Sequence, residues 1–231
     1  MKICKLIICG LLLTFTCFSQ EKKETFKGGE WLRYKMSYSG FFRAGTAVLE
    51  LKETNLNGEK VFYSKGTGWT SGLLKWFFKV DDVYESYFDK TPVKPFLFKR
   101  KINEGGYKKH RITKFDYASN TAYVQDFKNQ KDTSIVFSKV QDMLSSFYYL
   151  RKQDAKTLKK GDELAIDMFM DSQVYPFKLR FLRKEVIKTK FGKVKCLVFR
   201  PLVQSGRIFK AEESVTLWIT DEANKVPIKM K

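Results

Sequence analysis

Residues 138–153 constrain the fold more than any other segment, because they have a helical periodicity in a chain of strand-like segments. An apolar stripe with spacings of three and four residues runs along this segment and ends on a basic residue: Val140, Met143, Leu144, Phe147, Tyr148 and Arg151. The stripe predicts an amphipathic helix from about Lys139 to Lys152, with Leu144 and Phe147 buried. A helix with one apolar face needs a sheet to pack against.

The start of this helix is marked by Ser138 and Gln141, which have the three-residue spacing of a capping box. In that motif, two side chains bond to backbone donors that the first helical turn leaves unpaired. Ser145 is expected to lie off the apolar stripe, so its replacement by alanine should have little effect on stability.

Most of the remaining sequence alternates between apolar and polar residues, with turn signals between the alternating segments. This pattern is typical of antiparallel strands. Asn57-Gly58 predicts a tight hairpin, because both residues tolerate the positive φ angles of a two-residue turn. The sequence therefore predicts a mainly β protein: a strongly curved antiparallel sheet, as a half-barrel or incomplete barrel, covered by one amphipathic helix. A two-sheet β-sandwich is the alternative.

The N-terminal residues have the pattern of a secretory signal peptide. Lys2 and Lys5 give the segment a basic start. The apolar run that follows ends at Phe18 and is too short to span a membrane, and Ser19 is the small residue at its exit. We expect cleavage after Ser19. A lipoprotein anchored through Cys17 is the alternative interpretation of the same segment.

The predicted organisation has three parts. Residues 1–19 form the signal peptide, residues 20–29 a flexible lead and residues 30–231 a single β-rich domain, since no shift in composition divides the chain. The protein is then exported, and it lies in the periplasm or is associated with the outer envelope. No segment after the signal peptide is apolar enough to cross a membrane.

The chain has few of the residues that catalytic or metal-binding sets require. His110 is the only histidine and lies among cations, so neither a Ser-His-Asp triad nor a histidine-rich zinc site is expected. Cys196 is the only cysteine outside the predicted signal peptide, and in a strand-like segment it is expected to fill the core. The sequence has no phosphate-binding glycine loop and no dinucleotide fingerprint. We therefore predict no enzymatic activity, no metal and no cofactor.

The densest group of carboxylates consists of Asp81, Asp82, Glu85 and Asp89. Strand alternation places Glu85 among apolar neighbours, and it places Arg100 in the same position on the following strand. Because a buried charge needs a partner, we predict that Glu85 and Arg100 pair across adjacent strands inside the curved sheet. A carboxylate pair that hydrolyses cell-wall glycans is a less favoured alternative.

The full chain has a formal net charge of +19 at pH 7. In an exported protein, this charge favours anionic lipid, lipopolysaccharide or acidic glycan as partners, and it does not favour nucleic acid. The best cationic cluster is expected from Lys108, Lys109 and Arg111, with Lys99 and Lys101 on the neighbouring strand. Lysines that only solvate the outer face of a sheet would give the same composition.

Trp69 is a further candidate for ligand contact. Three glycines at positions 66, 68 and 72 surround it, and glycines in a strand pattern indicate a bulge or a loop close to a ligand. The predicted ligand-binding residues are Trp69, Glu85, Arg100, Lys108, Lys109 and Arg111.

Several short blocks of the sequence, in their order along the chain, resemble a known family. They include Gly29-Glu30-Trp31-Leu32-Arg33-Tyr34, Asp82-Val83-Tyr84-Glu85, Pro95-Phe96-Leu97-Phe98-Lys99-Arg100, Asp142-Met143-Leu144-Ser145-Ser146-Phe147, and Leu217-Trp218-Ile219-Thr220-Asp221. Over essentially all of its length after the signal peptide, the chain resembles the secreted bacterial family catalogued as domain of unknown function 3108.

The resemblance implies an exported and predominantly β protein, and it brings no assigned reaction or catalytic residues. The family pattern continues with a further strand after the Pro227 block, whereas this chain stops at Lys231, which would leave one sheet edge unpaired. The sequence thus predicts a non-enzymatic envelope protein that binds an amphiphilic or anionic ligand in a curved β-sheet. A structural or interaction module that docks on an envelope protein partner is the alternative.

Overall fold

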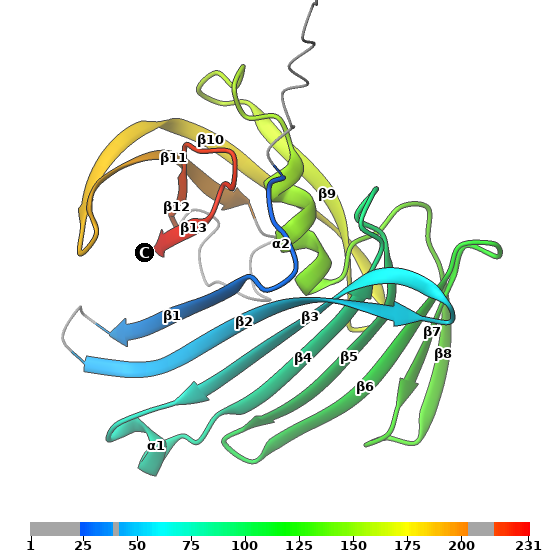
Figure 1. Cartoon of the computed structure of the whole chain (residues 1–231). Coiled ribbons are helices and arrows are strands. Elements are labelled where there is room, and N and C mark those ends of the chain that lie inside the picture. Colours follow the sequence, from blue (N-terminus) through cyan, green and yellow to red (C-terminus); the bar gives the residue numbers. More distant parts are fainter. Residues whose placement is uncertain (1–23, 39–41, 203–214) are drawn as a thin grey trace, which may run out of the picture.

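The computed structural model describes residues 24–38, 42–202 and 215–231, whose arrangement is shown in Figure 1. The predicted signal peptide, including Cys17 and Ser19, lies outside the described residues. Signal cleavage, lipid attachment and the division of the chain into three parts therefore stay predictions.

In the described residues, thirteen strands form two antiparallel sheets, A and B. Sheet A consists, in order, of β1 (Trp31–Tyr38), β2 (Phe42–Leu56), β3 (Glu59–Thr70), β4 (Asp81–Phe88), β5 (Pro95–Glu104), β6 (Tyr107–Asp116), β7 (Thr121–Asp126) and β8 (Lys131–Val136). Sheet B has the order β13-β12-β11-β10-β9, with β9 (Glu163–Met170), β10 (Gln173–Thr189), β11 (Gly192–Leu202), β12 (Leu217–Thr220) and β13 (Pro227–Met230). Each of these described strands pairs with the strands that precede or follow it directly in the chain.

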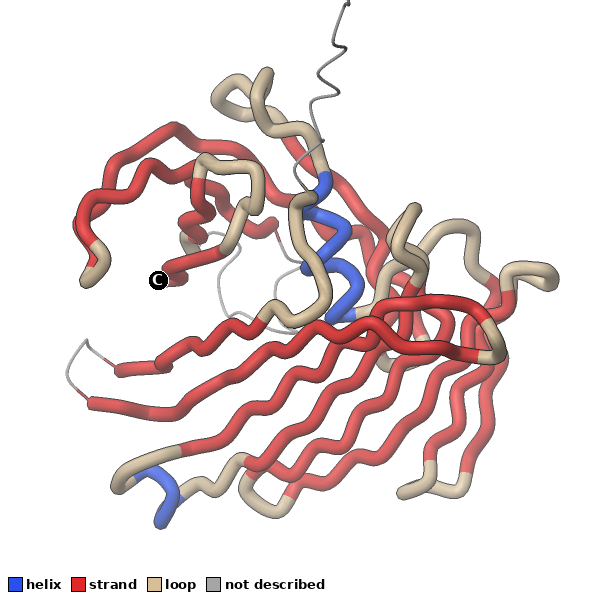
Figure 2. The backbone as a smooth tube through the Cα atoms, in the orientation of Figure 1, coloured by secondary structure: helices blue, strands red, loops and turns tan. Residues whose placement is uncertain are grey.

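Two helices complete the described part of the chain. The short helix α1 (Leu74–Phe77) lies in the connection between β3 and β4, and α2 (Met143–Lys152) follows sheet A in the chain. Figure 2 shows α2 between the two sheets and α1 apart from it, at one end of sheet A. The face of sheet A that packs against α2 is called the inner face below, and the opposite face is called the outer face.

The prediction of a mainly β protein is confirmed, and the tight hairpin is found at Asn57-Gly58. These two residues join β2 directly to β3 with φ angles of 52° and 89°. The expected single, strongly curved sheet is not what forms: the described strands make two antiparallel sheets, and neither sheet closes on itself. Alternation shows which residues share a face, but it does not show which strands pair, so the break after β8 has no signal in the strand pattern.

Helix α2 begins at Met143, later than the sequence predicts. Asp142 is the N-cap, and its Oδ1 accepts hydrogen bonds from the backbone N–H groups of Leu144 at 2.8 Å and Ser145 at 2.9 Å. The Ser145 hydroxyl accepts a bond from the backbone N–H of Asp142 at 2.9 Å and completes a capping box. Ser145 is fully buried, so its predicted position away from the packed side of the helix is wrong.

The predicted capping box of Ser138 and Gln141 is wrong because Gln141 has extended backbone pairing. Its N–H donates to the carbonyl of Asp167 at 2.8 Å, and its own carbonyl accepts from Phe169 N–H at 2.8 Å. These bonds join the start of α2 to β9. A residue paired in this way cannot also form a helical turn.

Two apolar clusters pack on α2 from opposite sides. The larger lies against sheet A and includes Phe26, Leu51, Phe62, Phe88, Phe98, Phe115, Leu144 and Tyr148. The smaller lies against sheet B and consists of Ala155, Leu179, Phe181, Leu197, Phe199 and Ile219. Leu144 is buried as predicted, whereas Phe147 is only half-buried. Cys196 fills the core on the other face of sheet B, as predicted.

Candidate functional site

Three of the six predicted ligand-binding residues, Trp69, Glu85 and Lys108, lie on the outer face of sheet A. Gly66 faces α2, where a methyl group would lie 3.2 Å from Cδ2 of Leu144. Because side chains alternate along a strand, Trp69 of β3 points the other way. Gly66 thus makes room for α2, whereas a side chain at Gly68 would meet open space. Both glycines lie within β3, so they do not form a ligand-facing loop. Lys108 is exposed.

The predicted pair of Glu85 and Arg100 is wrong. In the register between β4 and β5, Glu85 lies opposite Lys99, and Arg100 lies opposite Tyr84. Glu85 accepts a hydrogen bond from the Tyr63 hydroxyl at 2.5 Å. Arg100 is buried on the inner face. The two side chains therefore lie on opposite faces.

The Glu85–Arg100 prediction fails because polar residues occupy inner positions of β4. Asp82 and Ser86 are buried there together with Phe88. Asp82 accepts a hydrogen bond from the backbone N–H of Asn103 at 2.9 Å, and Ser86 donates to Asp142 at 2.6 Å. An alternation argument that assigns apolar residues to the inside selects the wrong phase in such a strand.

Arg100, Lys109 and Arg111, the other three predicted residues, come together on the inner face. Asp171, in the turn between β9 and β10, lies among them. Its Oδ1 accepts a hydrogen bond from Arg100 Nη1 at 2.7 Å and from Lys109 Nζ at 2.5 Å. Arg111 Nη1 donates to the same oxygen at 3.3 Å, and its Nε donates to Asp126 Oδ2 at 2.8 Å. These contacts join a turn of sheet B to sheet A.

The two carboxylates of this cluster, Asp126 and Asp171, offset part of the charge of its three cations. Burial alone would raise the pKa of Asp171, but the hydrogen bond from Lys109 and the charges of Arg100 and Lys109 hold that pKa below its usual value. Burial would also raise the pKa of Asp126, but hydrogen bonds from Asn129 and Arg111 outweigh burial and lower that pKa. The cluster therefore closes a contact between the two sheets, and its cations are already paired with the protein's own carboxylates.

Asp82 and Glu104 form a carboxyl pair near these cations. A hydrogen bond with Asp82 raises the pKa of Glu104, and burial raises it further. The two carboxyls are in hydrogen-bond contact, whereas glycan hydrolysis uses carboxyls about 5 Å or more apart. This pair therefore lacks the geometry of a glycosidase site.

An apolar cavity of about 70 Å³ lies between α2 and sheet B. On the helical side it is lined by Phe147 and Leu150 of α2 and by Ala155 of the following linker. Sheet B contributes apolar side chains from each of its strands: Leu164, Leu179, Leu197, Phe199, Leu217, Ile219 and Pro227. The cavity is small compared with the roughly 300–1,000 Å³ of complete ligand sites, so it has room for a short apolar segment of a ligand.

Arg151 of α2 lines the cavity and connects three segments of the chain. Its guanidinium donates to both carboxylate oxygens of Glu30, at 2.6 and 2.7 Å. Its Nε donates to the carbonyl of Asn224, in the β12–β13 turn, at 3.0 Å. The group also lies over the ring of Phe26, 5.3 Å from the centroid. Only 2% of Arg151 is exposed, so this bidentate ion pair is shielded from water.

Lys225, in the same turn as Asn224, is the second cation in the cavity wall. Burial lowers the pKa of Lys225, the charge of Asp154 raises it, and the charges of Lys156 and Arg151 lower it further. A cation whose charged form is disfavoured by burial is stabilised by a nearby anion. The cavity thus combines an apolar interior with a cationic border.

Asp142 fixes the position of α2 relative to the cavity. It is fully buried, and the Ser86 hydroxyl of β4 donates to its Oδ2 at 2.6 Å. Burial raises the pKa of Asp142 to about 6, although hydrogen bonds from Ser86 and from the first turn of α2 oppose this rise. The start of α2 is thereby attached to sheet A, and its later residues reach the cavity.

The sequence pattern identified Arg151 only as the polar end of a stripe, and it did not identify Lys225 or Asp142. An arginine in an otherwise apolar stripe is itself a signal, because arginine is rarely buried without a partner. Lys225 has no comparable signal, since it is one of many lysines in a strongly basic chain.

The part of the chain that the structure describes contains neither a metal-binding cluster nor a membrane-spanning helix. No group of histidine, cysteine, aspartate and glutamate side chains there is arranged to hold a metal ion. Neither α1 nor α2, the helices of that part, is long and apolar enough to span a membrane.

The sequence matches the family described as "Protein of unknown function (DUF3108)" over residues 33–231. A similar solved structure is a beta-barrel-like protein of domain of unknown function DUF1849 from Brucella abortus, with a TM-score of 0.50. The two chains are 12% identical, and the similarity covers 80% of each. At this identity the likeness concerns the fold alone. No curated protein matches the sequence.

Proposed function

We propose that this chain, which belongs to the DUF3108 family, is an exported, non-enzymatic binding protein for an amphiphilic ligand with an anionic end. The observation that carries the proposal is the apolar cavity with Arg151 and Lys225 in its wall. In this proposal the two sheets act together as an incomplete barrel, and α2 covers the site between them.

The cavity selects the chemical class of the ligand. Its interior would accept a short hydrocarbon segment, because burial of each methylene contributes about 0.8 kcal/mol. Arg151 already has a bidentate carboxylate partner in Glu30, so it would be a poor first contact for a ligand. Lys225 is half-buried and would gain most from an acidic head group. A fatty-acid-like or phospholipid-like molecule fits both requirements.

The ligand would bind by displacing the loosely packed side of α2, because the cavity is too small for a whole lipid. Leu150 and Phe147 are only half-buried at this boundary. Export, which the N-terminal residues predict, would bring the protein into contact with envelope lipids and lipopolysaccharide.

Binding of a dansyl-labelled fatty acid tests the proposal. Lys225→Gln should weaken binding of this probe about tenfold, the usual effect of losing a charged hydrogen bond. Ala155→Leu should also weaken binding, because the added carbons occupy the cavity. Lys229→Gln, a change of an exposed lysine in β13, is the matched control and should bind like the wild type. A dansyl-labelled alcohol of the same length should bind the wild type and Lys225→Gln equally.

Native mass spectrometry of the protein purified from its own envelope gives an independent readout. A retained acidic amphiphile would support the proposal. No retained lipid, together with equal probe binding by all variants, would overturn it and would favour the alternative of an interaction module that docks on an envelope protein.

A further inference from the structure

The connection between β3 and β4 carries the most exposed large apolar side chains near sheet A. The exposed fractions are 77% for Leu73, 87% for Trp76 and 86% for Phe77. Leu74 and Phe78 are exposed as well, at 41% and 47%. Isolated exposed apolar residues are ordinary, but a contiguous group of this kind indicates a surface that another apolar phase covers. Residues 71–79 are called the apolar loop below.

The apolar loop is a structured protrusion. The backbone N–H of Ser71 donates to the carbonyl of Ala44 in β2 at 3.0 Å. At the other end, Gly105 N–H in the β5–β6 turn donates to the carbonyl of Lys79 at 2.8 Å. Phe78 packs over Gly105, where any side chain would collide with the ring. The loop is therefore held at its base, and its apolar tip stays exposed.

The charges of the apolar loop are all positive. Lys75 and Lys79 are its only ionisable residues, and both are exposed. Lys101 and Lys108, on the adjoining β5–β6 hairpin, are exposed near the same end of sheet A. Asp81, at the start of β4, is the first acidic residue after the loop. Aromatic and aliphatic side chains between lysines form the composition of segments that enter the interface of an anionic membrane.

We propose that the apolar loop inserts into the head-group region of an anionic lipid bilayer. Residues 73–77 occupy about one helical turn, with successive side chains about 100° apart, so the apolar groups point in several directions. A protein partner needs a shaped surface of about 800 Å² on each side. A bilayer interface accepts apolar groups around the whole tip, and its negative surface attracts the lysines.

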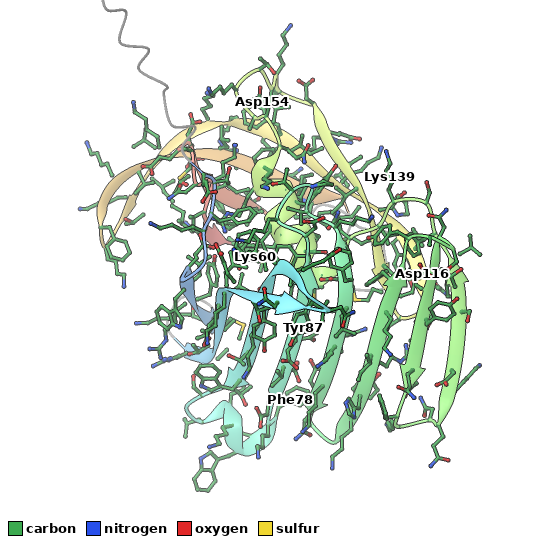
Figure 3. All side chains as sticks on the ribbon, turned by 45° about the vertical axis from the view of Figure 1, so that its right-hand side comes forward. Lys60, Phe78, Tyr87, Asp116, Lys139 and Asp154 are labelled. Carbon is green, nitrogen blue, oxygen red and sulfur yellow. The ribbon has the colours of Figure 1, made fainter. Side chains whose placement is uncertain are left out.

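This docking surface is separate from the cavity. Figure 3 shows Phe78 at one end of the molecule and Asp154, which precedes the cavity residue Ala155, near the opposite end. Membrane docking by the apolar loop would therefore turn the linker after α2 away from the bilayer. The inference does not depend on any ligand in the cavity.

Flotation with phosphatidylcholine vesicles that contain phosphatidylglycerol tests the inference. The double variant Trp76→Ser/Phe77→Ser should bind at least tenfold more weakly than the wild type, as expected from the apolar surface that it withdraws from the bilayer. Lys75→Gln/Lys79→Gln should also weaken binding, about fivefold for each lysine at low salt. All variants share the same N-terminal residues, so the differences report on the loop.

Phe191→Ser provides the matched control. Phe191 is 83% exposed in the β10–β11 turn and lies beside Lys190, so it has similar chemistry at another place. This variant should bind vesicles like the wild type. Equal losses for Phe191→Ser and the double variant would overturn the inference, as would wild-type protein that fails to bind at low salt.

Tryptophan fluorescence separates insertion from electrostatic adsorption. Vesicles should shift the emission of the wild type to shorter wavelength, and Trp76→Phe should lose most of that shift. Sedimentation tests a second copy as the alternative occupant of the loop. Wild-type dimers that the double variant abolishes, without vesicle binding, would also overturn the inference.

Discussion

Helix α2 meets the two sheets in different ways. On sheet A it lies close to the strands: Gly66 leaves room for Leu144, and Ser86 donates a hydrogen bond to Asp142. Tyr148 is fully buried and stacks on Phe88 with ring centroids 5.2 Å apart. On sheet B the facing residues are larger and apolar, and a cavity remains between them and the helix.

The difference is set by side-chain size and polarity. Small residues on β3 and β4, Gly66 and Ser86, contact the start of the helix. On β10 and β11, Leu179, Leu197 and Phe199 instead line the cavity beside the helix. A side of the helix that has few polar contacts can shift without leaving buried polar groups unpaired. The later residues of α2 therefore have fewer polar contacts on the side that faces the cavity than the first turn has with sheet A.

Two polar contacts are exceptions to this comparison. Backbone bonds of Gln141 join the start of α2 to β9, and Arg151 joins the helix to the β12–β13 turn. Arg151→Ala should lower the free energy of unfolding by about 3–5 kcal/mol, since it leaves Glu30 half-enclosed without its partner. Urea denaturation measures the loss. Arg183→Ala, which removes an exposed ion pair with Glu185, should cost at most about 0.5 kcal/mol. Equal costs would mean that the shielded contact contributes no more than a surface pair.

Two leucines of α2 test the comparison directly. Leu144→Ala on the sheet A side should cost about 2–5 kcal/mol, the usual range for a packed leucine. Leu150→Ala should cost less, about 1 kcal/mol, because Leu150 is half-buried and already borders a cavity. Thermal and urea denaturation provide the measurement. A larger loss for Leu150 would show that α2 is packed more tightly on sheet B than on sheet A.

The pKa of Asp142 predicts a pH dependence that comes from the sheet A side. Because burial raises this pKa to about 6, the stabilising contribution of the protonated carboxyl is present below about pH 4 and is lost as pH rises through 6. The loss amounts to roughly 3 kcal/mol, since each pKa unit corresponds to about 1.4 kcal/mol.

Asp142→Asn cannot ionise and should lack this loss. Stability curves in urea at several pH values measure the difference between wild type and variant. Relative to Asp142→Asn, the wild type should lose free energy of unfolding between about pH 4 and pH 6, and the difference should be constant above pH 7. A constant difference throughout would mean that burial does not perturb this carboxyl.

The smallest expected effect concerns the cap of α2. Ser145→Ala should cost about 1 kcal/mol, because the N–H of Asp142 loses its acceptor. Ser138→Ala should change the free energy of unfolding by at most about 0.5 kcal/mol, since Ser138 is exposed and does not cap the helix. A greater loss from the Ser138 variant would restore the earlier helix start that the sequence pattern predicts.

The predictable part of the fold depends on neighbours in sequence. Asn57-Gly58 needs only its own backbone angles, and the stripe through Leu144 and Tyr148 needs only the geometry of one helix. Which residues of β4 face inward was not predictable in this way. Ser86 is buried there because it donates a hydrogen bond to Asp142, which lies 56 residues away in the sequence. Such long-range polar contacts leave no local pattern.

The candidate site shows the same limit. Lys109 and Arg111 were predicted in one cationic cluster, and Arg100 was predicted apart from it as the partner of Glu85. Their common partner Asp171 was not predicted, because it comes from a distant turn. The cavity was not predictable, since it forms between a helix and a second sheet whose pairing the sequence does not encode locally.

The order of strands in sheet A also has a consequence for the time course of folding. Each strand pairs with the next one along the chain, so the sheet can grow from its first hairpin by short loop closures with little entropic cost. The bonds from Ser86 to Asp142 and from Arg151 to Glu30 span 56 and 121 residues, so they must close late. Until α2 arrives, a nascent sheet would expose Phe62, Phe88 and Phe98 on its inner face. That interval is when we expect the chain to be most prone to aggregate and to need a holding chaperone.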